Sequence, residues 1–251
     1  HMNLHEFLIV CPLVFLAGFV DAIAGGGGLI SLPAYMFAGI PVHHAIATNK
    51  LSSATGTAVS TWHLVKSKCV DICLVPGTVA CAFVGSIAGA NLALIISDKV
   101  LKTVLVFVLP VVAFCVLRDK DLKPVIPEGF TRKKQYLIMA ACSFVIGIYD
   151  GFYGPGTGTF LLIMFMGLAH LTSMESAAYT KILNLSSNVC SMVTFLLGGH
   201  ILLLLGLTAS VFSIAGHYVG AGMVLKNGTK VIRPIILVVL ALLFIKIIFN
   251  L

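Results

Sequence analysis

Four charged side chains lie well inside apolar stretches of the sequence: Asp21, Lys50, Asp150 and Lys181. An ionised side chain in a membrane-spanning segment is costly, so it normally faces a cavity or pairs with another charge, and it often marks an ion pathway. The lysines could attract an anionic substrate, while the aspartates could carry a coupling ion or brace the chain. The alternative is a purely structural Asp–Lys pair that fixes helix packing.

Polar residues surround both lysines. They are Thr48, Asn49, Ser52, Ser53 and Thr55 beside Lys50, and Thr180, Asn184, Ser187 and Asn188 beside Lys181. In a helix, Lys181, Asn184 and Asn188 share one face, because they are spaced by three and four residues. The predicted anion-binding residues of these two patches are therefore Asn49, Lys50, Thr180, Lys181, Asn184 and Asn188.

Glycine-rich segments interrupt two apolar runs shortly after the aspartates. They read GFVDAIAGGGGLISLP at 18–33 and GIYDGFYGPGTGTFLL at 147–162. Each glycine costs roughly 1 kcal/mol in a helix interior, so we expect each run to break and a short helix to follow. The first N–H groups of such a helix can bind an anion, and glycine lets a ligand approach the backbone. The predicted site therefore also contains Gly25, Gly26, Gly27, Gly154, Gly156 and Thr157, with close helix packing as the alternative.

The composition indicates which elements must hold these residues. The chain has 251 residues, 59% hydrophobic and 10% charged, with a mean hydropathy of +1.08. Soluble domains have about a quarter charged residues, so we predict an all-α integral membrane protein. The net charge of +7 lies mostly in short loops, where basic residues set topology and do not indicate nucleic-acid binding. No metal or cofactor is predicted, and the cysteines are expected to pack as small apolar residues.

Ten apolar segments predict the helices. They are 4–24, 28–40, 45–65, 72–96, 101–117, 135–153, 157–170, 176–198, 200–225 and 231–249. A membrane-spanning helix needs about 20 residues, and the two short segments, 28–40 and 157–170, each follow a glycine break. We therefore expect each half of the chain to contain a glycine-broken helical hairpin followed by three spanning helices.

The chain contains an internal repeat. Asp150 follows Asp21 by 129 residues and Lys181 follows Lys50 by 131, which is explained by a two-residue insertion in one of two similar halves. The predicted parts are a first transmembrane repeat at 1–117, a cytoplasmic linker at 118–134 and a second transmembrane repeat at 135–251. His1 and Met2 at the start of the first repeat are interpreted as a cloning remnant.

The orientation of the halves follows from counting loop charges. If residues 4–40 cross the membrane an even number of times, the second half is inverted, and eleven Lys and Arg residues face one side against two on the other. Parallel halves would divide them eight against five. The positive-inside rule favours the inverted repeat, with both termini outside and the 118–134 linker in the cytoplasm.

The duplicated glycine segments, together with ATNKLSS at 47–53 and YTKILN at 179–184, resemble the TauE/SafE sulfite exporter family, also called the toluene sulfonate uptake permeases. The resemblance covers essentially the whole chain. It implies a multi-pass secondary transporter in the plasma membrane of a bacterium or archaeon. The implied substrates are small sulfur-containing anions such as sulfite or organosulfonates, and the expected site lies at the membrane midplane between inverted repeats.

Other functions are weighed against this one. The main alternative is a channel of the same architecture for anions or small solutes. An enzyme is not predicted, because no nucleophile with a base and no metal cluster is convincingly arranged. His217 lies inside an apolar run and could relay protons, with a hydrogen-bonded packing role as the alternative. The sequence leaves open the anion, the direction of transport, the oligomeric state and whether a proton or a sodium ion is coupled.

Overall fold

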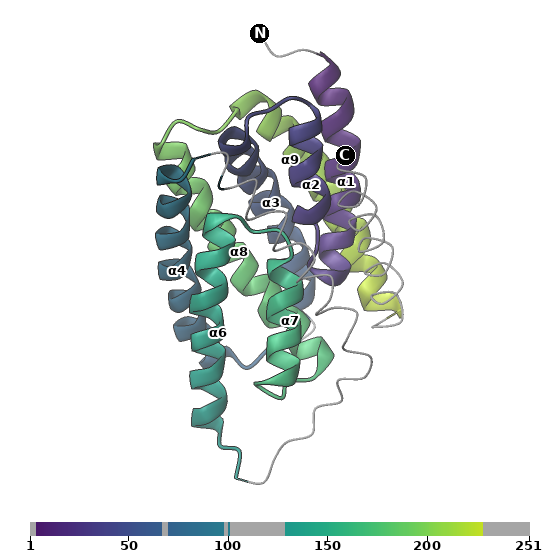
Figure 1. Ribbon diagram of the computed structural model, residues 1–251. Helices are drawn as coiled ribbons and strands as arrows, with labels where there is room; N and C mark the ends of the chain where they lie inside the picture. The colour runs from purple at the N-terminus through teal and green to yellow at the C-terminus, as the bar shows by residue number, and fades with distance from the viewer. Residues whose placement is uncertain (1–3, 67–69, 98–99, 101–128, 228–251) are drawn as a thin grey trace.

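The computed structural model describes residues 4–66, 70–97, 100 and 129–227, and this part of the chain folds as a bundle of helices without strands (Figure 1). The elements are α1 (Leu4–Ala24), α2 (Gly28–Phe37), α3 (Val42–Val65), the short 3₁₀ helix η1 (Ile72–Leu74), α4 (Val75–Ile95), α6 (Arg132–Phe152), α7 (Thr157–Gly167), α8 (Ser173–Leu197) and α9 (Leu203–Asn227). The predicted all-α class is confirmed. The predicted segments 101–117 and 231–249 lie outside the described residues.

Four helices of the described chain are long and apolar enough to cross a membrane. They cover Leu4–Ile23, Ile72–Ile95, Arg132–Phe152 and Leu203–Lys226. The outward faces of α4 and α9 expose large apolar side chains such as Val84 and Leu207, as expected for surfaces that contact lipid. These four helices are typical of a multi-pass membrane protein.

Helices α3 and α8 are also long enough to span the bilayer but are much more polar than α1, α4 and α9. They pack against each other and against α4 and α9, and Figure 1 shows them in the interior of the bundle. Their serine, threonine, asparagine and lysine side chains are buried there. A polar helix is tolerated at membrane depth only where protein or a water-filled cavity surrounds it, so their position follows from their composition.

Corresponding helices of the two halves run in opposite directions. The His44 ring at the start of α3 lies 2.7 Å from the carbonyl oxygen of His200, just after the end of α8. At the other end of the bundle, the Gln135 amide near the start of α6 donates to the Ala169 carbonyl after α7, at 2.7 Å. Figure 1 shows the α1–α2 hairpin opening upward and the α6–α7 hairpin opening downward.

The halves interlock through glycine contacts. Helix α4 packs against α6, and α1 packs against α9. A Cβ at Gly89 would overlap the carbonyl of Ile148, and a Cβ at Gly216 would overlap that of Phe15. Small residues allow helix backbones to approach this closely in membranes. The first half therefore packs α4 closely against α6 of the second half, and the second half packs α9 closely against α1 of the first.

The two glycine breaks meet in the middle of the bundle. Gly25 has a φ of +75°, and a Cβ there would lie 2.6 Å from the carbonyl carbon of Gly158. A Cβ on Gly28 would lie 3.0 Å from the Cα of Pro155. The glycines thus let the backbones of the two hairpin tips touch, a requirement separate from any ligand.

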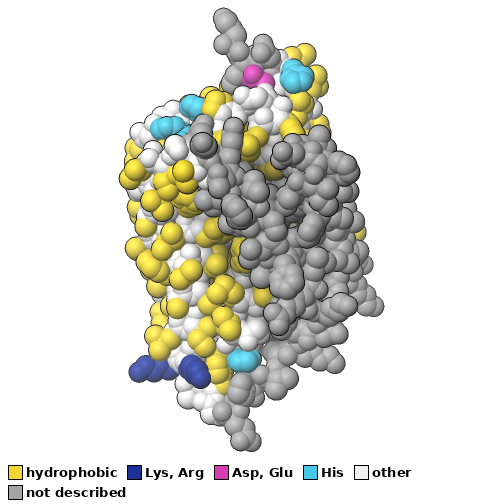
Figure 2. Space-filling view, in the orientation of Figure 1, with side chains coloured by type: hydrophobic (Ala, Val, Ile, Leu, Met, Phe, Trp, Pro, Cys, Tyr) yellow, Lys and Arg dark blue, Asp and Glu magenta, His cyan; other side chains and the backbone are white. Residues whose placement is uncertain are grey.

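The ends of the bundle differ in charge. Apart from Lys50 and Lys181, the Lys and Arg residues of the described chain are Lys66, Arg132, Lys133, Lys134 and Lys226. These residues lie just after α3, in the first turn of α6 and at the end of α9. Figure 2 shows Lys and Arg side chains at the lower end of the visible surface.

Helix α6 begins at Arg132, so the last three residues of the predicted linker form its first turn. The repeat boundaries and the cytoplasmic position of the linker stay predictions.

Candidate functional site

Each membrane lysine pairs with the aspartate of the opposite half. Lys50 Nζ lies 2.9 Å from Asp150 Oδ1, and Lys181 Nζ lies 2.7 Å from Asp21 Oδ2. Each of these side chains is at least 87% buried. The structure therefore brings together all four charges that the sequence singled out, as two ion pairs that cross between the halves.

Asp150 is held mainly by neutral groups besides its lysine. The Thr157 hydroxyl donates to Oδ1 at 2.8 Å, and the Ser187 hydroxyl donates to Oδ2. Lys50 in turn donates to Asn188 Oδ1 at 3.0 Å. A buried ion pair needs such additional hydrogen bonds to offset the loss of hydration.

Asp21 is held by a different set of groups. The backbone N–H of Gly27 donates to its Oδ1 at 3.1 Å, and Nε2 of His217 lies 3.2 Å from its Oδ2. Lys181 also donates to the carbonyl oxygen of Asp21. The N-terminus of α2, where the sequence predicted a substrate anion, is therefore occupied by a carboxylate of the protein itself, which this positive helix end also favours.

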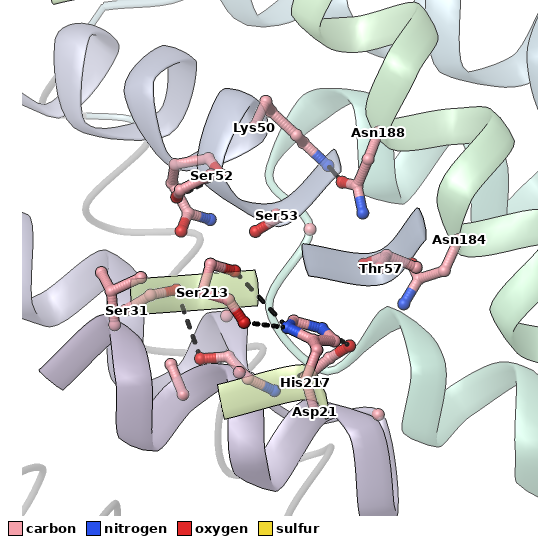
Figure 3. Close-up of a pocket in the computed structure, with 18 of the residues that line it drawn as sticks. Asp21, Ser31, Lys50, Ser52, Ser53, Thr57, Asn184, Asn188, Ser213 and His217 are labelled. Atoms are coloured by element: carbon pink, nitrogen blue, oxygen red, sulfur yellow. Dashed lines mark hydrogen bonds and ion pairs between the residues drawn. The ribbon is translucent and has the colours of Figure 1, made fainter. Parts of the chain in front are cut away.

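A small polar cavity lies between these groups, and Figure 3 shows the labelled side chains around it. Its lining contains Val14, Ala17, Gly18, Asp21, Gly25, Gly27, Gly28, Ser31, Asn49, Lys50, Ser52, Ser53, Thr57, Asp150, Gly154, Asn184, Asn188, Ser213 and His217. The centres of water molecules can occupy about 30 Å³ of it. One water needs roughly 10–15 Å³ by this measure, so the cavity has room for two or three waters.

Nine of the predicted site residues line this cavity. They are Asp21, Gly25, Gly27, Asn49, Lys50, Asp150, Gly154, Asn184 and Asn188. These residues come from the α1–α2 tip, α3, the α6–α7 tip and α8. The structure therefore places the two glycine breaks and the two polar patches around one space.

The other five predicted residues lie outside the lining. Thr157 and Lys181 do not line the cavity themselves but contact the aspartates that do: Thr157 contacts Asp150, and Lys181 contacts Asp21. Gly156 has a φ of +83° and precedes α7 as its N-cap, so its role is conformational. A Cβ on Gly26 would make only ordinary contacts, the nearest at 3.6 Å from Leu29. Within the part of the chain that the structure describes, the buried Thr180 hydroxyl has no hydrogen-bond partner.

Some lining residues were not among the predicted site residues, although Ser53 was noted beside Lys50 and His217 as a proton relay. Ser53 and Thr57 follow Lys50 by three and seven residues, and Ser213 precedes His217 by four. These spacings place each set on one helix face, which is the signal that would have revealed them. Ser31 gives no comparable signal, because it belongs to α2, whose position against α3 depends on the tertiary fold.

The electrostatic balance of the site is close to neutral. Two lysines and two aspartates offset each other, so neither lysine is free to hold an anion without a change in its ion pair. The remaining polar lining consists of hydroxyl and amide groups and the ring of His217, and the buried oxygen of the Asn49 amide has no hydrogen-bond partner among the described residues. Such neutral donors together with lysine can bind an oxyanion.

Comparisons with known proteins give a family match and several named relatives. The family profile described as sulfite exporter TauE/SafE matches residues 10–247. A protein of Escherichia coli K12 named probable membrane transporter protein YfcA is 34% identical over 243 residues, covering 95% of this chain and 88% of the relative. The probable membrane transporter protein ORF9 of a Sinorhizobium species is 34% identical over 237 residues, covering 94% and 89%. A probable membrane transporter protein of Haemophilus influenzae is 32% identical over 237 residues, covering 94% and 92%. No solved structure matches the chain.

Proposed function

This chain belongs to the TauE/SafE sulfite exporter family of membrane transporters, and on that premise we propose that it is a secondary transporter of small sulfur-containing anions. Sulfite and organosulfonates are the proposed substrates. Their proposed site is the polar cavity between the two halves, with Asn49, Lys50, Asn184 and Asn188 as the lining residues that bind the anion and Lys181 as a residue that acts through Asp21.

The two crossed ion pairs are the observation that carries this proposal. Lys50 with Asp150 and Lys181 with Asp21 tie opposite halves together on the inside of a membrane bundle. Transporters built from two repeats bind their substrates near the bilayer midplane, where broken helices meet, and work by rocking one repeat against the other. An ion pair that joins the repeats is a contact that such a motion must strain or exchange.

A substrate anion can take part in that exchange. An oxyanion that reaches Lys50 can replace part of its contact with Asp150, because both ligands are oxygen acceptors. The amides of Asn184 and Asn188 offer further donors on the same face of α8. The proposed binding step is therefore an exchange of partners, and the ion pairs re-form when the site is empty.

The size of the cavity favours a carrier over a channel. Its space of about 30 Å³ for water centres holds a few waters, and a larger anion must move the lining apart to enter. A channel would need a continuous open path, whereas a carrier alternates between two access states. The lysine-rich lower end is proposed to face the cytoplasm, in agreement with the positive-inside rule.

The test is solute exchange in proteoliposomes. Vesicles with purified protein are loaded with unlabelled sulfite, thiosulfate, sulfate, taurine or sulfoacetate, or with acetate as a control, and uptake of the same radiolabelled compound is measured. A carrier of sulfur-containing anions gives saturable uptake driven by the unlabelled compound inside. Conductive flux without such counterflow would support a channel, and counterflow of acetate alone would exclude the proposed substrates.

One variant locates the site. Asn184 lines the cavity but takes part in neither ion pair, so Asn184→Leu removes a donor without freeing a buried charge. A hydrogen bond to a charged group contributes about 1.5–3 kcal/mol, so we expect apparent affinity to fall roughly tenfold or more. Lys226→Met, in the exposed last turn of α9, is the matched control and should exchange like the parent.

A further inference from the structure

His217 is placed with an acceptor at each nitrogen. Nδ1 lies 2.9 Å from the carbonyl oxygen of Ser213, and Nε2 lies 3.2 Å from the carboxylate of Asp21. A neutral imidazole has one N–H and one lone pair, so one nitrogen of a neutral ring would direct its lone pair at an oxygen. The Ser213 hydroxyl also lies 3.4 Å from Nδ1 and can donate to it in a neutral ring, but the Ser213 carbonyl oxygen is closer to Nδ1, at 2.9 Å, and would still face the lone pair. One additional proton, on the ring or on Asp21, satisfies both contacts.

The charged groups around the ring balance one another, so an added proton does not meet a net positive charge. Helix α1 contributes Asp21, and α8 contributes Lys181 through the same carboxylate. From α3, Lys50 lines the shared cavity with its partner Asp150, and the ring of His63 contacts Tyr218, next to His217. With His217 neutral, the two lysines and two aspartates cancel. With the proton bound, the site carries one net positive charge.

Only one half of the molecule has this arrangement. The residues that correspond to Gly56 and His217 in the other half are Ser187 and Ser86, at the same spacing of 131 residues. The Ser187 hydroxyl donates to Asp150, and Ser86 donates to the Ser187 carbonyl at 2.7 Å. Hydroxyl groups do not titrate near neutral pH, so the Asp150 side has no counterpart of the His217 proton.

We propose that His217 and Asp21 form a proton-binding site, and that its proton supplies the net positive charge with which the cavity accepts an anion. The proton and the anion then move together, because binding of either one favours the other. The proton is taken up from the solution on the side where the anion enters and is released with it on the opposite side. This inference rests on the proposed anion transport for its coupling, but the proton site itself can be tested without any substrate.

The first experiment observes the proton directly. The chain is labelled with ¹⁵N-histidine, reconstituted in lipid and studied by solid-state NMR as a function of pH, with His217→Gln used to assign the signal. We expect the His217 ring to show two protonated nitrogens, or a strong hydrogen bond to a protonated Asp21, near neutral pH, with loss of the proton at higher pH. A ring that is neutral and pH-independent, beside an ionised Asp21, would overturn the proposal.

The second experiment replaces the site by its counterpart from the other half. In the double variant Gly56→Ser/His217→Ser, a serine hydroxyl takes the place of Ser187 and can donate to Asp21, while the ring is removed. The single change Gly56→Ser would place its Cβ against both the Ser213 hydroxyl oxygen and the His217 ring, so the ring is removed in the same variant and the Ser213 hydroxyl must rotate away. The control is His63→Gln, which removes a membrane histidine that contacts neither aspartate.

Transport of radiolabelled thiosulfate and methanesulfonate, two anions of strong acids, separates the outcomes. We expect an inward proton gradient to stimulate uptake by the parent and by His63→Gln about tenfold, within the usual range for coupled sites, and not to stimulate the serine double variant. Equal stimulation of the double variant, or exchange by the parent that ignores the gradient, would overturn the coupling and leave anion transport standing. If neither anion is transported, proposed transport fails for them, and the NMR result still decides whether the proton site exists.

Discussion

The carboxylates at the two hairpin tips are held in contrasting ways, although each pairs with a lysine from the opposite half. Asp150 receives two neutral hydroxyl groups, from Thr157 and Ser187. Asp21 receives a backbone N–H from Gly27 and faces the ring of His217. The two halves therefore share the ion pairs but differ in the groups around them. Asp21 also faces a histidine, whereas the other side-chain partners described for Asp150 are hydroxyl groups.

This difference follows from the sizes of two side chains on neighbouring helices. On the Asp21 side, Gly56 of α3 has no side chain, and a Cβ there would overlap the His217 ring of α9. On the Asp150 side, Ser187 of α8 fills the corresponding place and the smaller Ser86 of α4 packs against it. Gly56 with His217 thus occupies the same kind of space as Ser187 with Ser86. The first pair of residues provides an imidazole, and the second provides two hydroxyl groups.

The largest effect is expected on the Asp150 side. Lys50→Met would leave a buried carboxylate with only neutral donors, and breaking a buried ion pair costs about 3–5 kcal/mol. We expect a large fall in the thermal unfolding midpoint, measured in detergent. The double variant Lys50→Met/Asp150→Asn should recover much of this loss. A single variant as stable as the parent would show that Asp150 does not depend on its lysine.

The Asp21 side should tolerate loss of its lysine better, and in a way that depends on pH. In Lys181→Met, His217 remains beside Asp21, and the proton of the proposed His217–Asp21 site can offset part of the lost lysine charge, so the stability deficit should be smaller in acid than in alkaline solution. The deficit is measured by unfolding the variant and the parent between about pH 5 and pH 8. A deficit that is independent of pH and equals that of Lys50→Met would remove the contrast between the two sides.

The contact between the tips should show a smaller effect. Gly25→Ala places a Cβ 2.6 Å from Gly158 in a backbone conformation that disfavours side chains, and overpacking of this kind costs about 1–3 kcal/mol. Gly26→Ala is the matched control, because its Cβ has ordinary contacts, and it should change stability by less than about 0.5 kcal/mol. Equal effects of both substitutions on the unfolding midpoint would mean that the tips do not require close backbone contact.

The smallest effect is expected for an ion pair outside the membrane interior. Arg132 pairs with Asp71, and both side chains are largely exposed to solvent. An exposed ion pair contributes about 0–1 kcal/mol, so Arg132→Ala should lower stability slightly, and added salt should reduce the difference further. A loss as large as that of Lys50→Met would show that this pair is not screened by solvent.

Much of this architecture can be predicted from the sequence because it depends on local chemistry. The glycine runs predicted breaks followed by short helices, and the structure places α2 at Gly28–Phe37 and α7 at Thr157–Gly167. The composition predicted a helical membrane protein, and the duplicated motifs pointed to the TauE/SafE family that the comparisons confirm. The orientation in the membrane and the identity of the anion remain predictions.

The sequence by itself determined which residues would be unusual, because a charge or a glycine run is conspicuous in an apolar segment wherever that segment packs. It did not determine which aspartate meets which lysine, since Asp21 is closer along the chain to Lys50 than to Lys181. Nor did it reveal that the glycine tips touch or that His217 faces Asp21. Those contacts join segments far apart in sequence, and only the packing of the halves against each other decides which groups come within hydrogen-bonding distance.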